Sequence, residues 1–281
     1  MTSRSAATYL GQMPSKYVDI QGVATFLRHA GATTLPERPP PLDRGEIVLC
    51  LHHRGGNARN FDSFANELSG DHSPLAFDLP GHDRSGSQVG LSSVEAMADF
   101  AAAVLKGVQA DRPAIVVGHG MGGNVALQLA CSHREAVKAV VLVASGARYV
   151  GGDDLIEKSR FVSLGRARRE FNQKAFGKNT PGAILRAGFM DTMKTDPRVI
   201  YSNLIAMRDW DADAALAEVV VPVLLVVGDS EHPDVRAEID RTAAELSNTH
   251  FEVLEDAAHM LPLEHPGALA RGVGAFLGEL S

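Results

Sequence analysis

The chain has 281 residues, a net charge of −7 and 22% charged residues, which is the composition of an ordinary globular protein with room for one large core. The lack of a basic surplus argues against nucleic acid as a partner, and there is no run of about eighteen apolar residues that would predict a membrane span. The N-terminal segment lacks the unbroken apolar stretch of a signal peptide. We therefore expect a cytoplasmic protein that acts on a small molecule. The sequence does not indicate its oligomeric state.

Compact apolar runs alternate with helical patterns along most of the sequence. A short strand pair is expected at Tyr17–Ile20 and Val23–His29, followed by a Pro-rich surface loop. Six further runs are separated by segments with apolar residues three or four apart, which predicts an α/β fold: a mostly parallel, eight-stranded sheet with helices on both faces. These six runs are Glu46–Leu51, Leu75–Phe77, Ala114–Val117, Ala139–Val143, Val221–Val227 and Phe251–Leu254.

One interval interrupts this alternation. Residues 147–210 contain no strand-like run, only charged and amphipathic helical sequence such as EKSRFVSLGRARREF. We expect a helical lid inserted here after the sixth strand, with residues 1–146 and 211–281 forming the core. Such a lid would cover the carboxyl edge of the sheet, where open α/β folds bind their ligands.

The segment AIVVGHGMGGNVALQLA, at Ala114–Ala130, predicts a buried strand, a Gly-rich turn and a helix. Here the chain resembles the α/β-hydrolase superfamily, whose nucleophile elbow reads GxSxG and projects its central side chain over the sheet edge. The stretches LCLHHRGGN, FDLPGHDRSG, VVGDSEHP and DAAHMLPLEHP follow the family in the same order. The resemblance implies an α/β-hydrolase fold in which Gly120 stands where the family places its nucleophilic serine, so that no acyl-enzyme can form at this position.

The resemblance also implies a catalytic pair near the C-terminus. His259 matches the family's catalytic histidine, which can shuttle a proton when a carboxylate fixes its tautomer. Glu231 lies where the family places this acid, with Asp229 as the alternative. His82 and His119 occupy places where related hydrolases often carry histidine without catalytic duty, so we expect packing and hydrogen-bonding roles for both.

Two further loops depart from the family pattern. His53 stands where the oxyanion loop usually has glycine, and Arg54 follows where a small residue is common. Asp83 replaces the usual last glycine of the PGxGxS loop. Together with Gly120 these departures suggest a rebuilt site, and they argue against Gly120 being a single introduced change in an ordinary serine enzyme.

The first hypothesis is a hydrolase that cleaves an ester, lactone or amide bond by activating water directly. His259 would act as the general base, and the Met121 amide with an amide of the oxyanion loop, near His53 and Arg54, would stabilise the oxyanion. A sharper version adds a divalent metal ion such as zinc.

The candidate ligands of this metal ion are His53, Asp83 and His259, which would leave coordination positions open for water. The competing interpretation is that His53 and Asp83 pair with each other or with Arg54 and Arg84, because buried polar groups must find partners.

The second hypothesis is a non-hydrolytic member of the fold. It would be either a cofactor-free, lyase-like enzyme that uses the histidine and its acid, or a ligand-binding protein without turnover, because the fold alone does not fix the chemistry. A retained histidine with a carboxylate partner favours an enzyme. The sequence does not identify the substrate.

Overall fold

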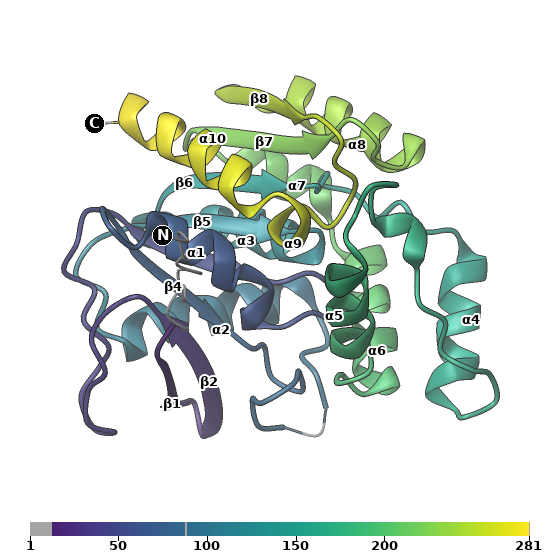
Figure 1. The fold of residues 1–281 in the computed structure, drawn as a ribbon, viewed down its shortest axis with the longest axis horizontal. Coiled ribbons are helices and arrows are strands. Elements are labelled where there is room, and N and C mark those ends of the chain that lie inside the picture. Colours follow the sequence, from purple (N-terminus) through teal and green to yellow (C-terminus); the bar gives the residue numbers. More distant parts are fainter. Residues whose placement is uncertain (1–12, 88, 281) are drawn as a thin grey trace, which may run out of the picture.

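The computed structural model describes residues 13–280 except residue 88. Its strands form one sheet of eight in the order β1-β2-β4-β3-β5-β6-β7-β8 (Figure 1). β1 pairs with β2, and β2 with β4, in antiparallel fashion, whereas the remaining neighbours are parallel. The prediction of a mostly parallel, eight-stranded sheet is confirmed.

Each strand coincides with an apolar run that the sequence marked, and only the bounds differ by a few residues. The strands are β1 (Ser15–Ile20), β2 (Val23–His29), β3 (Ile47–Leu51), β4 (Ser73–Phe77), β5 (Ala114–His119), β6 (Val137–Val143), β7 (Val223–Gly228) and β8 (Thr249–Leu254).

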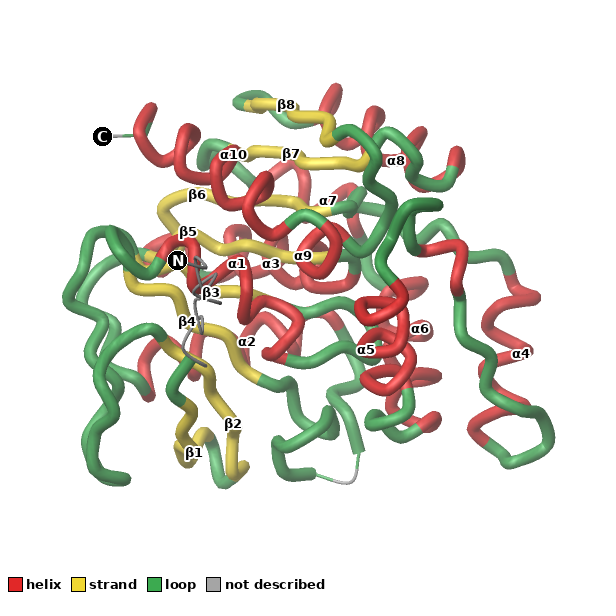
Figure 2. Tube along the Cα trace, viewed as in Figure 1, coloured by secondary structure: helices red, strands yellow, loops and turns green. Residues whose placement is uncertain are grey.

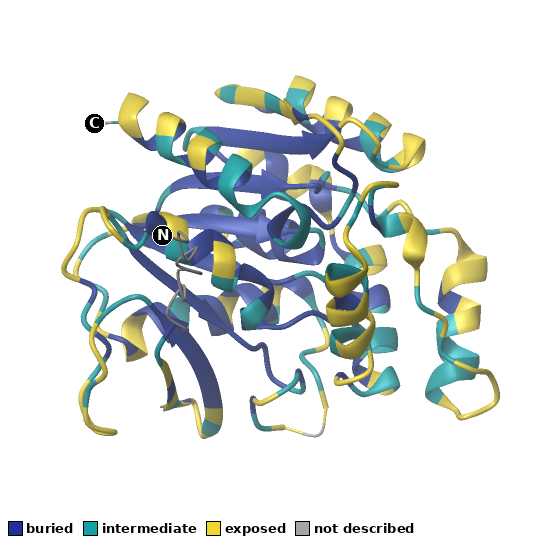
Figure 3. Cartoon of the chain, in the orientation of Figure 1, coloured by how far each residue is buried: buried dark blue, intermediate teal, exposed yellow. Residues whose placement is uncertain are grey.

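The central strands are buried on both faces, which is why they read as continuous apolar runs (Figure 3). In β3, Leu49 packs into the core on one face of the sheet and Val48 and Cys50 into the core on the other. Helices cover both faces (Figure 2). The first face holds α2 (Val94–Gly107), α3 (Met121–Ser132), α7 (Ala212–Glu218) and α8 (Pro233–Glu245), and the second holds α1 (Asp62–Leu68), α9 (Leu261–Glu264) and α10 (Pro266–Glu279).

Between β6 and β7 the chain forms the predicted helical segment, which lies beyond the carboxyl ends of the strands (Figure 1). Its helices are α4 (Asp153–Ser163), α5 (Gly182–Thr192) and α6 (Pro197–Asp209). The helical pattern of EKSRFVSLGRARREF is longer than α4 itself. The helix ends before the pattern does because Gly165 takes a φ of +69°, which terminates it. Its function as a lid stays a prediction. In the described part of the chain no helix has the length and apolar character needed to cross a membrane.

Where α3 packs against β3, the backbones of the two elements are in tight contact, and this contact gives a test of the fold. A Cβ atom at Gly122 would lie 2.1 Å from the carbonyl oxygen of Leu51, whereas a Cβ atom at Gly278 in α10 would meet nothing within 4 Å. We expect Gly122→Ala to lower the free energy of unfolding by at least about 2 kcal/mol, and Gly278→Ala to raise it by up to about 1 kcal/mol. Urea unfolding of both variants measures this, and equal effects would contradict the packing described.

Candidate active site

The turn between β5 and α3 holds Gly120 at the carboxyl edge of the sheet. Gly120 has a φ of +53° and a ψ of −118°, a backbone conformation that favours glycine. Its N–H donates to the Val143 carbonyl at 3.1 Å, and its carbonyl accepts from the Ser145 hydroxyl at 2.8 Å. Met121 begins α3, and the first N–H groups of a helix have no acceptor within the helix. The turn therefore directs the N-terminal N–H groups of α3 and the positive end of the helix dipole toward the site.

A side chain at residue 120 would point at two histidines that are distant in sequence. A Cβ atom added to Gly120 would lie 3.3 Å from the Cβ of His53 and 3.6 Å from Nε2 of His259. The loops after β3, β5 and β8 therefore meet around Gly120.

His259 forms a hydrogen bond with Glu231. Nδ1 of His259 lies 2.9 Å from Oε2 of Glu231, whose side chain is only 3% exposed. The other carboxylate oxygen accepts from the backbone N–H of His232 at 2.8 Å. Because an ionised carboxylate can only accept, Nδ1 carries the proton and Nε2 keeps its lone pair. This lone pair belongs to the nitrogen that faces Gly120, which is the arrangement of a general base.

Asp229, the alternative acid, has a structural role. Its carboxylate accepts from the backbone N–H of Asp256 at 3.0 Å and of Ala257 at 3.3 Å, and the first of these bonds lowers the pKa of Asp229 below its usual value. Asp229 thereby ties the loop after β7 to the loop after β8, and it holds Glu231 and His259 in reach of each other.

His53 turns its Cβ, and not a ring nitrogen, toward Gly120. Its Nδ1 bonds the carbonyl oxygen of Arg54 at 2.9 Å, and its ring packs edge-on against His119 with centroids 4.9 Å apart. Burial lowers the pKa of His53 to about 3, so the ring is neutral near pH 7. Its neighbour Arg54 is partly buried, and in the described residues its guanidinium has no hydrogen bond or ion pair.

Three more histidines surround the site without facing Gly120. Nε2 of His119 forms a hydrogen bond with the carbonyl oxygen of His259 at 2.8 Å, and this bond fixes the loop that carries His259. His82 accepts from the Asn203 side chain at 2.9 Å, and Nε2 of His52 accepts from the Leu79 N–H at 3.1 Å. Burial lowers the pKa of each. All three therefore serve as neutral hydrogen-bonding groups.

The three residues suggested as metal ligands do not assemble into a metal site. Oδ2 of Asp83 accepts from the guanidinium of Arg59 at 2.5 Å, a partner that the sequence did not suggest, and Nδ1 of His53 is bound to a backbone carbonyl. No group of three His, Cys, Asp or Glu side chains in residues 13–280, residue 88 aside, could hold a metal ion. The prediction that His53, Asp83 and His259 form one ligand set is wrong, because each of the first two is turned to another partner.

Asp78 is a site residue that the sequence reasoning missed. Its buried carboxylate accepts from the N–H of Ala58 at 2.7 Å and of Arg84 at 3.0 Å, which joins the loops after β3 and β4. Burial raises its pKa to about 6. Asp78 is part of the motif FDLPGHDRSG, so the motif marked its loop as important, but it did not indicate which groups the carboxylate contacts.

The helical segment contacts two of the loops around Gly120, those after β3 and β8. Ala175 accepts at its carbonyl from the backbone N–H of His259 at 3.1 Å. The Thr195 hydroxyl donates to the Gly55 carbonyl at 3.1 Å, and the Asn60 amide donates to Asp191 at 3.0 Å. The segment therefore lies directly against the residues that surround Gly120.

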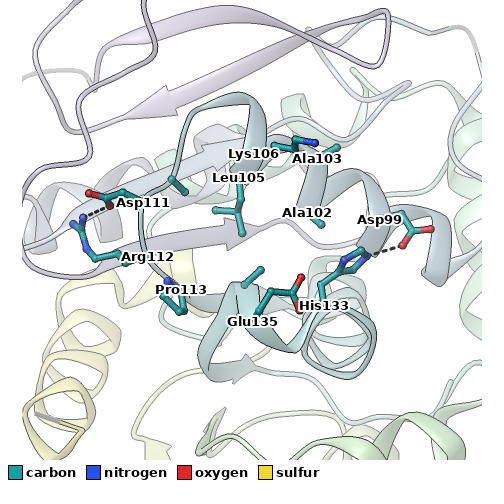
Figure 4. A pocket seen from close by; sticks show the side chains of 12 residues that line it. Asp99, Ala102, Ala103, Leu105, Lys106, Asp111, Arg112, Pro113, His133 and Glu135 are labelled. Atoms are coloured by element: carbon teal, nitrogen blue, oxygen red, sulfur yellow. Dashed lines mark hydrogen bonds and ion pairs between the residues drawn. The ribbon is translucent and has the colours of Figure 1, made fainter.

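A second groove lies at the opposite, amino-terminal end of the strands, between α2 and the chain that leads into β5 and β6 (Figure 4). Its His133 bonds Asp99 at 2.8 Å, and its Arg112 bonds Asp111 and the carbonyl of Gly45. The groove is remote from Gly120, and its His133 and Arg112 already have partners.

Residues 48–272 match the model of the family described as "Alpha/beta hydrolase family", and the chain belongs to this family. It is similar to the pimeloyl-(acyl-carrier protein) methyl ester esterase of Neisseria meningitidis, with 32% identity over 248 residues that cover 83% of this chain and 94% of the relative.

Solved structures share the fold at lower identity. A thermophilic esterase from Thermogutta terrifontis, with malate bound, superposes with a TM-score of 0.79 at 20% identity, over 96% of this chain and 99% of the other. The enol-lactonase from Burkholderia xenovorans gives a TM-score of 0.77 at 19% identity, over 94% and 100%. These structures show the fold alone. The family match over residues 48–272 makes the chain a hydrolase of the α/β fold, and its reaction has to be argued from its own site.

The contact between Gly120 and His53 yields a prediction about stability. Gly120→Ser would place a Cβ atom 3.3 Å from that of His53 at a φ of +53°, whereas Gly165→Ser, at a φ of +69°, would meet nothing within 4 Å. We expect Gly120→Ser to cost about 1–3 kcal/mol of unfolding free energy, more than Gly165→Ser, because only the first change adds a steric contact to the backbone strain.

A double-mutant cycle with His53→Gly isolates this contact. We expect the Gly120→Ser change to cost less in the His53→Gly background, by at least about 0.5 kcal/mol in chemical denaturation. Additive effects would show that His53 does not limit the space beside Gly120.

The buried histidines predict an acid-labile fold. Burial is the largest cause that lowers the pKa of His29 and His52 to about 4 and of His53 to about 3, from 6.5. Below pH 6.5 the unfolded chain binds protons that the folded chain does not, so stability is fully present above this pH and is lost as the pH falls toward 4. Asp62, Asp78 and Glu252 act in the opposite direction, because burial raises the pKa of each carboxyl group. These three are outnumbered by the five histidines whose pKa burial lowers, since His82 and His119 belong to the same set.

We expect the free energy of unfolding to fall between pH 7 and pH 5 by on the order of 1–2 kcal/mol per buried histidine. Urea unfolding at the two pH values measures the loss, and His29→Gln should reduce it. An unfolding free energy that is constant or rises toward pH 5 would contradict the assignment of neutral, buried rings.

Proposed function

We propose that this protein hydrolyses a carboxylic ester by activating water directly, without a covalent acyl-enzyme. The observation that carries the proposal is the pair formed by His259 and Glu231, with Nδ1 at 2.9 Å from the carboxylate and Nε2 at 3.6 Å from the place of a Cβ atom on Gly120. A base with a fixed tautomer faces a residue that has no side chain. The reacting group next to this base can then be water instead of a hydroxyl of the protein.

In the proposed reaction, Nε2 of His259 takes a proton from water as the water oxygen bonds to the ester carbonyl carbon. The carbonyl oxygen becomes an oxyanion, which accepts from the Met121 N–H at the start of α3 and from an amide of the loop at His53 and Arg54. Glu231 stabilises the imidazolium. When the intermediate collapses, the C–O bond of the leaving alcohol breaks and Nε2 returns its proton to the alkoxide. The products are an acid and an alcohol.

The ester bond, as opposed to a lactone or an amide, is favoured by the relatives. The Neisseria meningitidis protein is named a methyl ester esterase, and it aligns with 83% of this chain. The reaction takes no step through a metal ion, because Asp83 is bound to Arg59 and His53 is turned away from Gly120.

Variants of the two catalytic residues test the proposal. We expect His259→Ala to lower kcat for short-chain methyl esters by about 10²–10⁴-fold and Glu231→Gln by a comparable factor. The matched control is His133→Ala, which removes another histidine paired with a carboxylate, Asp99 at 2.8 Å, from the groove at the far end of the strands (Figure 4). This control should retain full activity.

Three results would contradict the proposal. Ester hydrolysis that survives His259→Ala would exclude this base, and turnover that a chelator abolishes would require a metal. A wild-type protein that binds esters without cleaving them would instead favour the non-hydrolytic alternative.

A further inference from the structure

Arg54 is a partly buried cation without a counterion in the described residues. Two other arginines that are shielded from solvent, Arg28 and Arg59, each have one. Arg28 forms two hydrogen bonds with Asp62, at 2.9 and 2.6 Å, and Arg59 binds Asp83 at 2.5 Å. Burial lowers the pKa of Arg54, which shows that its charge is poorly hydrated in this place. Because buried charges are normally paired, Arg54 is suited to an anion that the protein does not itself supply.

The position of Arg54 places this cation at the candidate active site. Arg54 directly follows His53, whose Cβ would lie 3.3 Å from a Cβ atom on Gly120. The two side chains also interact electrostatically, since the Arg54 charge adds to the effect of burial in lowering the pKa of His53. An anion bound to Arg54 would therefore lie beside the loop that contacts Gly120.

Tyr149 supplies an independent, unused donor beside Arg54. It lies in the loop after β6, at the same edge of the sheet, and its hydroxyl is buried without a hydrogen-bond partner in the described residues. Burial raises its pKa, and the nearby positive charges of Arg54 and Arg208 oppose this rise. Arg208 is itself bound to Asp209, and the carboxylate of Asp153 contributes to the raised pKa of Tyr149. A buried hydroxyl without an acceptor needs an explanation, and a ligand oxygen would provide it.

We propose that Arg54 and Tyr149 bind a free carboxylate on the ester substrate, which makes the substrate class a half-ester of a dicarboxylic acid. The inference rests on the proposed function and deepens it. A carboxylate can accept from the guanidinium and from the phenol at once. A carboxylate carries one negative charge, which Arg54 alone neutralises. A phosphate monoester would carry a charge of about −1.5 to −2, and the Asp153 carboxylate nearby would repel it.

A comparison of charged and neutral esters tests the carboxylate site. We expect the wild-type protein to prefer the monomethyl ester of glutaric or adipic acid over the dimethyl ester by at least about tenfold in kcat/KM. Arg54→Met should abolish the preference, and Tyr149→Phe, which removes only the hydroxyl, should reduce it several-fold. Because the readout is a ratio of two substrates, a general loss of activity cancels. Arg166→Met, at an exposed arginine of the helical segment, is the control that should keep the preference.

A binding measurement separates the two proposals. Glutarate should bind to the wild-type protein in calorimetry, and about tenfold more weakly to Arg54→Met. Binding of this kind without any ester hydrolysis would support the carboxylate site and contradict the proposed function. Hydrolysis of both esters with equal efficiency, a preference that survives Arg54→Met, or inorganic phosphate that binds as well as glutarate would overturn the carboxylate site.

Discussion

The hydrogen bond between Nδ1 of His259 and the Glu231 carboxylate is the interaction on which the rest of the site depends. It fixes the proton on Nδ1 and leaves the Nε2 lone pair directed at Gly120. Two supports hold it in place. The Asp229 carboxylate joins the loop of Glu231 to the loop of His259, and Ala175 of the helical segment binds the His259 backbone. A base held this firmly has a use in catalysis that a binding site would not require.

Gly120 and His53 fit each other at the carboxyl edge of the sheet. The turn conformation of Gly120 and the position of the His53 Cβ both disfavour a side chain at residue 120. His53 is in turn fixed by its bond to the Arg54 carbonyl and by its contact with His119. The loop at His53 and the turn at Gly120 therefore fit one another, and this fit favours glycine at residue 120.

The sequence predicted the fold better than the direction of individual side chains. Buried strands such as Ala114–His119 are readable because apolar runs and elbow glycines are local signals. The choice between Glu231 and Asp229 needed the loop geometry. The prediction of a metal-ligand set was wrong because Arg59, the partner of Asp83, lies 24 residues away in the sequence and no sequence pattern links the two residues. For the same reason no sequence signal connects Arg54 with Tyr149, since their proximity arises only when the loops after β3 and β6 come together.

In the proposed mechanism water, and not a group of the protein, attacks the ester carbonyl carbon. The most direct test is the intact mass of the protein, measured after rapid acid quench during steady turnover of an activated ester. Direct attack by water predicts that only the unmodified mass is present while product accumulates, and that product forms without an initial burst. A population of protein heavier by the mass of the acyl group would contradict it.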